Sequence, residues 1–339
     1  MTRVVLFLTL LPILIWTVSI TARQQKSNDQ KKDDNINLKV DLVTLDAQVL
    51  RQKGERIAWR LKQEDFVVYE DGVRQKITNF SQDTLPLSVI LLIDRRGSLE
   101  PFTEKVQAAV NETIKSLKPE DEIAVMVFSD KSQLLQAFQT DKAKTAKALK
   151  GIPYMDVGIP NHCFNVGLYD AAAYMRAAAN PAGRRVIIVF TDTYRGINRT
   201  KPTTDEANRA VLESGSTICA MIVSCSCSAV GNVILGGISG AAKAAGQGTL
   251  NVKSLVEETG GEFVSVNPNN AEFQFDNLLT RIRTRYAIGY VSSNPKHDGS
   301  YRKLKVEITP EAEKREGKLI IKTRQGYIAP TLELLKEKK

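Results

Sequence analysis

Continuous apolar runs that alternate with helix-like segments constrain the fold of this chain more than any other feature. Residues 87–94, 123–128 and 186–190 are such runs, and a run without polar alternation is typical of a strand buried on both faces. Between and after them, apolar residues recur at helical spacing. Strands alternating with helices over about 200 residues predict βαβ units and a mostly parallel sheet covered on both faces. Further strands are predicted at 134–138, 217–223 and 262–266, and helices at 102–117, 165–179, 204–214, 254–259 and 273–285.

Two acidic residues stand where strands of this predicted sheet end. Asp94 closes the first run, and Asp192 follows the third. In open α/β sheets, ligands bind beyond the carboxyl ends of the strands, which meet at one edge. We therefore expect Asp94 and Asp192 to lie at the same rim, where they form the clearest chemical constellation in the sequence.

The segments on either side of this region have a different pattern of polar and apolar residues. Residues 36–82 and 286–327 alternate polar and apolar residues, which is typical of β-strands, and residues 36–82 contain no helix-period segment. Asp71-Gly72, between apolar runs, predicts a tight hairpin with a return strand from Val73 to Phe80. Each segment is too short to bury much core alone. We therefore expect them to pack together as one small β-sandwich, with the α/β domain inserted between them.

The N-terminus has the layout of a secretory signal peptide. A short positive start precedes the apolar run 4–20, and small residues up to Ala22 precede a polar stretch. Since the run is long for a signal peptide and slightly short for a membrane span, an uncleaved anchor remains an alternative. The predicted organisation is a signal peptide at 1–22, a flexible leader at 23–35, an N-terminal β segment at 36–84, an α/β domain at 85–285, a C-terminal β segment at 286–330 and a charged tail at 331–339.

The charge and the cysteines exclude some classes of function. The formal net charge is +9. A charge of this size is compatible with binding to anionic lipid or glycan, and also with having no specific partner. No Lys/Arg block is interleaved with aromatics, so nucleic-acid binding is not expected. Cys219 lies in an apolar run and is expected to be buried, whereas Cys163 could pair with Cys225 or Cys227 if the chain is exported. The spacing does not suit a zinc site.

A set of short motifs, in order, resembles the von Willebrand factor type A (VWA) domain, and more closely the VWFA-related exported proteins of acidobacteria. The resemblance implies a Rossmann-like doubly wound domain and, commonly, a metal-ion-dependent adhesion site. The motifs are Leu91-Leu92-Ile93-Asp94-x-x-Gly97-Ser98, Gly167-Leu168-Tyr169-Asp170-Ala171, Phe190-Thr191-Asp192, Thr259-Gly260-Gly261, Tyr286-Ala287-Ile288-Gly289-Tyr290, Asp298 to Lys303 and Arg324-Gln325-Gly326-Tyr327.

The adhesion site implied by this resemblance is incomplete in the chain. Asp94, Ser98 and Asp192 match metal-binding positions, but Arg96 stands at a Ser position and Val166 at the Thr position. A hard cation such as Mg²⁺ takes about six oxygens. Val166 supplies none, and the Arg96 guanidinium would repel the ion. We expect no resident cofactor, although Mg²⁺, Mn²⁺ or Ca²⁺ remains an alternative if the partial site still binds.

Two interpretations of Arg96 follow. Its guanidinium could replace the metal and pair with Asp94 and Asp192 through charge-assisted hydrogen bonds. Alternatively, it points into solvent and the site has simply decayed. In both cases Arg96, Ser98, Val166 and Asp192 are the residues expected to face a partner.

The function expected from these features is non-catalytic. The sequence contains no phosphate-binding glycine loop, no Ser-His-Asp set and no zinc motif, so an enzyme is not predicted. We expect an exported protein, periplasmic or extracellular, that binds a protein or glycan partner at the cell envelope. The alternative is a metal-independent structural component of an envelope complex. The sequence does not predict the oligomeric state.

Overall fold

The computed structural model describes residues 42–331 with internal gaps. The gaps are 53–57, 59, 83–84, 96–107, 109, 112–113, 115–116, 151, 153–162, 181–182, 193–194, 198–200, 224–248 and 268. The predicted signal peptide and leader, Arg96, Ser98, Cys225, Cys227 and the tail after residue 331 therefore lie outside the described residues. Within the described ranges, no helix is both long and apolar enough to cross a membrane.

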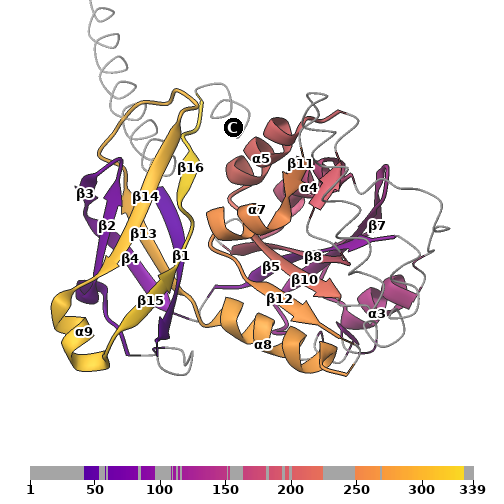
Figure 1. Cartoon of the computed structure of the whole chain (residues 1–339), viewed down its shortest axis with the longest axis horizontal. Helices are drawn as coiled ribbons and strands as arrows, with labels where there is room; N and C mark the ends of the chain where they lie inside the picture. Colours follow the sequence, from indigo (N-terminus) through magenta and orange to yellow (C-terminus); the bar gives the residue numbers. More distant parts are fainter. Residues whose placement is uncertain are drawn as a thin grey trace, which may run out of the picture. The chain divides into compact units, whose positions relative to one another are not determined.

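A six-stranded sheet forms the centre of the larger domain (Figure 1). Five of its strands are parallel, and the edge strand β7 runs antiparallel to β6. In spatial order the strands are β12 (Phe263–Val266), β10 (Thr217–Val223), β8 (Arg184–Thr191), β5 (Leu87–Asp94), β6 (Glu122–Phe128) and β7 (Ser132–Gln139). A separate two-stranded sheet joins β9 (Arg195–Ile197) to β11 (Thr249–Asn251).

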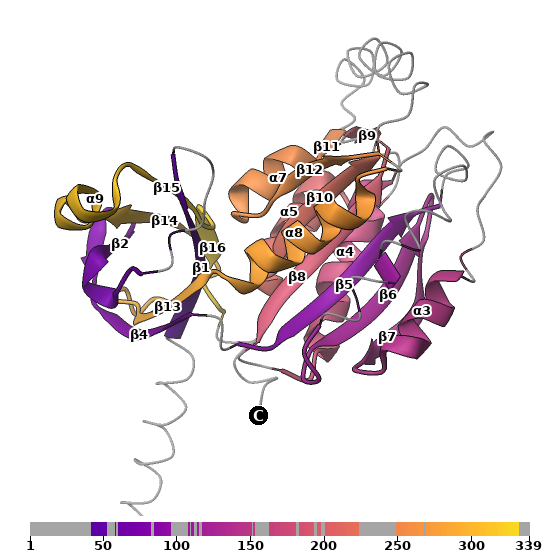
Figure 2. The ribbon, with the colours of Figure 1, turned by 90° about the horizontal axis from the view of Figure 1, so that it is seen from below.

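Helices cover both faces of this sheet, as Figure 2 shows. One face packs on α4 (Phe164–Tyr174), α5 (Thr204–Ser214) and α7 (Val252–Glu258). The other packs on α3 (Lys142–Lys150), α8 (Ala271–Arg283) and the helical residues Val110 and Ile114. Along β5, Val89 and Leu91 enter one core and Ile90 and Leu92 the other, because successive strand residues point to opposite faces. The predicted α/β fold with a mostly parallel, doubly covered sheet is confirmed.

Two four-stranded sheets form a second, smaller domain, called here the β-domain. Both sheets contribute to one core, as predicted for the two flanking segments. The first sheet has the order β15 (Leu319–Lys322), β1 (Leu42–Arg51), β13 (Tyr286–Val291) and β4 (Ile77–Gln82). The second has the order β16 (Gly326–Ile328), β14 (Tyr301–Ile308), β2 (Phe66–Glu70) and β3 (Val73–Gln75). Helix α9 (Pro310–Glu316) joins β14 to β15.

The predicted hairpin at Asp71-Gly72 is present, but its return strand differs from the prediction. Asp71 and Gly72 both have positive φ, +47° and +83°, as a two-residue hairpin turn requires. The predicted single strand from Val73 to Phe80 is instead divided: β3 pairs with β2, whereas β4 pairs with β13 in the other sheet. The chain thus crosses from one sheet to the other near Lys76, because β3 and β4 pair with different strands.

The chain enters and leaves the α/β domain through neighbouring strands of the β-domain. Gln82, at the end of β4, is the ladder partner of Tyr286, at the start of β13. The α/β domain occupies the sequence between these two residues. Its two connections to the β-domain are therefore held side by side.

The two domains also contact each other through a glycine turn. Gly260 has φ +70° and lies so close to the loop between β15 and β16 that a Cβ atom would come within 2.3 Å of the Thr323 carbonyl carbon. The Gln325 amide donates to the Glu258 carbonyl (2.8 Å), and the Lys322 ammonium donates to the Glu262 carboxylate (3.0 Å). Gly260 and Glu262 immediately precede β12, so this junction lies at the amino ends of the parallel strands, opposite the rim that contains Asp94.

Candidate functional site

Asp94 ends β5 at the carboxyl rim of the central sheet and is fully buried. The next strand, β8, runs parallel to β5 with Phe190 opposite Ile93. This register brings the buried Thr191 hydroxyl to Asp94, where it donates to the carboxylate over 2.9 Å. The hydroxyl holds the Asp94 side chain in one orientation at the rim.

Asp192 follows Thr191 directly and is half-buried. Since β5 and β8 are neighbouring parallel strands, the structure places Asp94 and Asp192 at the same edge of the sheet. Arg96 and Ser98 follow Asp94 closely in the sequence, but those two residues lie outside the described part. Two of the expected rim residues are thus brought together, and two are not located.

Val166 lies in the first turn of α4, whose N-terminus approaches the end of β6. The Cys163 amide donates to the Ser129 carbonyl (3.1 Å), and the Val166 amide donates to the Cys163 carbonyl (3.0 Å). Gly167 permits this approach, because a Cβ there would lie 2.8 Å from the Phe128 ring. Val166 is 9% exposed and its side chain is two methyl groups, so it offers no oxygen at this position.

Further hydroxyl and carboxylate groups lie in the segment that joins β6 to β7 and on α4. Ser129 donates to Asp130 (3.0 Å), and Ser132 at the start of β7 hydrogen-bonds to Asp170 of α4. Sequence reasoning did not assign Ser129, Asp130 or Ser132 to the rim, although they follow the second apolar run directly. That position alone was a usable signal, since β6 is parallel to β5 and ends at the same edge.

The described residues do not fit a complete divalent-cation site. Asp94 and Asp192 supply carboxylate oxygens, but Val166 supplies none, and the Thr191 hydroxyl is directed at Asp94. Within the described ranges, no group of three or more His, Cys, Asp or Glu side chains could hold a metal ion. A hard cation with about six oxygen ligands would therefore need most of its shell from water or from residues outside those ranges.

Comparison with known families identifies the central domain. Residues 89–195 match the family model described as the von Willebrand factor type A domain. The chain contains a VWA domain. The match begins within β5 and ends in β9, so it includes Asp94, Thr191 and Asp192.

Several solved structures resemble the chain at low identity. Proximal thread matrix protein 1 from the mussel byssus is 12% identical with a TM-score of 0.42, over 61% of this chain and 49% of that one. The von Willebrand factor domain of the type V pili tip protein Mfa5 from Porphyromonas gingivalis is 12% identical with a TM-score of 0.43, over 59% and 95%. BatB from Bacteroides thetaiotaomicron is 14% identical with a TM-score of 0.40, over 58% and 98%.

The chain thus spans about half the length of the mussel protein. A further structure of that protein, 12% identical with a TM-score of 0.44 over 62% and 50%, is described with a zinc-occupied MIDAS motif. Comparison with curated protein sequences gave no match. Similarities at this level do not bear on the function of the chain.

Metal binding can be tested at the position of Val166. We expect isothermal titration with Mg²⁺, Mn²⁺ and Ca²⁺ to show no micromolar binding to the unmodified protein, because the donor set is incomplete. The double variant Arg96→Ser, Val166→Thr should acquire measurable affinity, since it removes a fixed positive charge and adds two hydroxyl oxygens. Val166→Ile, which changes size without adding oxygen, is the control. Micromolar binding by the unmodified protein would show that the domain completes the site in another way.

Proposed function

We propose that this protein is an exported, non-catalytic binding module whose VWA rim recognises a protein or glycan at the cell envelope without a resident metal ion. The observation that carries the proposal is the composition of the rim: Asp94 and Asp192 share one edge, whereas buried Val166 replaces an oxygen donor. At this rim the half-buried Asp192 can offer a carboxylate to a partner, whereas Asp94 is buried and bonded to Thr191. A partner with basic or hydroxyl groups is therefore favoured over an acidic one.

The cysteines of the described part support a non-catalytic function. Cys163 is 2% exposed and Cys219 is fully buried. Burial raises the pKa of the Cys219 thiol to about 11, so at neutral pH it stays protonated and a poor nucleophile. Both side chains are buried, whereas nucleophilic catalysis needs an accessible sulfur.

The proposed organisation places the binding rim away from the β-domain. In it, residues 1–22 direct export, 23–35 form a leader, and residues 85–285 form the VWA domain between two β segments. Within the described residues, the junction around Gly260 lies at the amino ends of the parallel strands, opposite the rim. This arrangement supports a rim that faces a partner outside the chain.

Capture of partners from an envelope extract tests the proposal. We expect the full chain without residues 1–22 to retain one or more components in the presence of EDTA. The variant Asp192→Lys should lose them, because it reverses a charge at the rim. The matched control Glu311→Lys makes the same change on α9 of the β-domain, and it should retain them.

The alternative function, a structural component of an envelope complex, gives a different result. In that case the complex survives Asp192→Lys and is lost with Glu311→Lys or other changes in the β-domain. Capture that EDTA abolishes would contradict metal-independent recognition. Both readouts come from the same set of purified variants, so the outcomes can be compared directly.

A further inference from the structure

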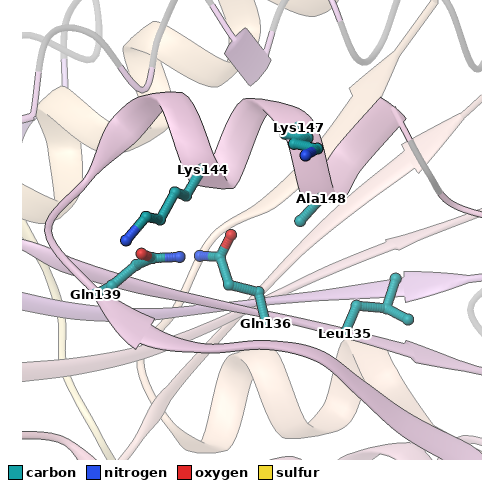
Figure 3. Close-up of a pocket in the computed structure, with 6 residues that line it drawn as sticks. All are labelled: Leu135, Gln136, Gln139, Lys144, Lys147 and Ala148. Carbon is teal, nitrogen blue, oxygen red and sulfur yellow. The ribbon is translucent and has the colours of Figure 1, made fainter.

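An open groove lies on the side of the VWA domain, between the edge strand β7 and helix α3 (Figure 3). Its volume is about 420 Å³, within the range of small-ligand sites, which is about 300–1,000 Å³. The groove is separate from the rim. Gln139, one of its lining residues, pairs with Ile123 at the amino end of β6, whereas Ser132 pairs with Phe128 at the rim end. The lining residues are Leu135, Gln136, Gln139, Lys144, Lys147 and Ala148.

Irregular strand pairing explains why these side chains gather on one face. Val125 of β6 faces Gln136, but its neighbour Met126 faces Leu134, so Leu135 is an extra residue in the ladder. A second irregularity lies between Ile123 and Val125. Such bulges redirect side chains that would otherwise alternate between faces. As a result Leu135 and Gln136, which are consecutive, both line the groove below α3.

The two glutamine side chains differ in their hydrogen bonding: Gln136 is fixed in the wall of the groove, whereas the Gln139 amide is uncommitted. The Gln136 amide nitrogen donates to the Ile123 carbonyl (3.2 Å) and to the Thr145 hydroxyl (2.9 Å), which fixes the side chain. Its amide oxygen is buried and has no hydrogen-bond partner. Gln139 makes no side-chain hydrogen bond to any residue that the structure describes. Figure 3 shows both amides extending from β7 toward α3, with Lys144 beside Gln139.

Helix α3 contributes positive charge at the groove. Lys144 and Lys147 are exposed, and no acidic side chain lines the groove. The Lys144 ammonium lies 3.9 Å from Asp141, which is 48% exposed, so this pair contributes little. Lys147 forms no ion pair with a described residue. By contrast, Lys142 on the same helix donates to the Lys118 and Asp121 carbonyls and has a structural role.

We propose that this groove binds the uronic acid unit of an acidic polysaccharide. The Lys144 and Lys147 ammonium groups match the sugar carboxylate. The Gln139 amide, which makes no side-chain hydrogen bond to a described residue, can donate to and accept from ring hydroxyls. Leu135 and Ala148 provide a small apolar surface for the C–H face of the ring.

Other ligands fit the groove less well. A divalent cation would find no carboxylate there, and a nucleic acid would find no aromatic side chain among the lining residues for base stacking. A second copy of this chain would bring the same lysines close to each other across a two-fold axis. The proposal does not depend on the function assigned to the rim, because no rim residue contributes to the groove.

Isothermal titration of the full chain without residues 1–22 tests the proposal with three probes: trigalacturonate, the neutral trisaccharide maltotriose and inorganic phosphate. We expect trigalacturonate to bind and the other two to bind at least about tenfold more weakly, which corresponds to about 1.4 kcal/mol. Lys144→Gln with Lys147→Gln should reduce trigalacturonate affinity at least about tenfold. The matched control, Lys150→Gln with Lys314→Gln, also removes two exposed positive charges but outside the groove, and it should bind normally.

Gln139→Ala tests the hydroxyl contacts without changing the charge. It should weaken trigalacturonate binding while leaving the thermal unfolding temperature unchanged, because the Gln139 side chain makes no hydrogen bond within the described structure. Equal losses in the groove variant and its control would overturn the proposal in favour of general charge attraction. Binding of maltotriose or phosphate as tight as that of trigalacturonate, or no binding of trigalacturonate, would also overturn it.

Discussion

Gly260→Ala is expected to lower the free energy of unfolding by about 2–5 kcal/mol. The positive φ of +70° at this residue disfavours any side chain, and the new Cβ would overlap the backbone of Thr323 and Arg324. Backbone atoms cannot turn aside as a flexible side chain can. The turn must therefore move away from the loop between β15 and β16, which breaks the hydrogen bond from Gln325 to Glu258. Chemical denaturation measures the loss.

Gly72→Ala is the matched control for this prediction. Gly72 also has a positive φ, +83°, but a Cβ there would have no atom within 4 Å. This variant should lose only the conformational part, about 1–2 kcal/mol. Limited proteolysis adds a second readout, since Gly260→Ala should expose the junction to cleavage and Gly72→Ala should not. Equal effects of the two substitutions would show that packing against Thr323 contributes nothing.

Arg184→Met is expected to cost about 3–5 kcal/mol, the range for removing one partner of a buried ion pair. The Arg184 guanidinium is 1% exposed and connects the two domains. It donates to the Asp46 carboxylate of β1 (2.9 Å) and to the carbonyls of Arg283 (2.7 Å) and Arg285. Methionine fills much of the same space but leaves the Asp46 charge and both carbonyls without this donor. Thermal and urea unfolding should both report the loss.

Two further variants separate the ion pair from general packing. Lys201→Met removes an exposed partner of Glu206, and it should cost no more than about 1 kcal/mol. The double variant Arg184→Met, Asp46→Leu removes both charges together, and it should recover part of the stability lost by Arg184→Met alone. Additive losses in the double variant would show that Asp46 and Arg184 do not stabilise the junction as a pair.

The strands of the central sheet could be predicted because their apolar runs are local in sequence. The expected bounds of β5 and β10 agree with the structure, and α5 begins at its capping pair Thr203 and Glu206. Helix α3 was not predicted, because of its nine residues only Thr145 and Leu149 are buried. The division between β3 and β4 was not predictable either, since it depends on which distant strand each half pairs with.

The rim could be predicted in part from the sequence, whereas the groove could not. Asp94 and Asp192 could be located from the ends of apolar runs alone. The Thr191 hydrogen bond to Asp94 requires the register between β5 and β8, which the sequence does not show. The groove beside α3 requires two bulges in β7, and the residues that form it have no unusual pattern. Local patterns thus indicate where strands end, whereas side-chain convergence depends on pairing between distant segments.

The pairing of Gln82 with Tyr286 has a mechanical consequence. The covalent path between β1 and β16 runs through the whole VWA domain, but the ladder between β4 and β13 bypasses it. Tension applied along the chain is therefore carried by the β-domain, and the VWA domain stays unloaded while that ladder holds. A pull on the rim, in contrast, reaches the β-domain through two adjacent tethers that share the force.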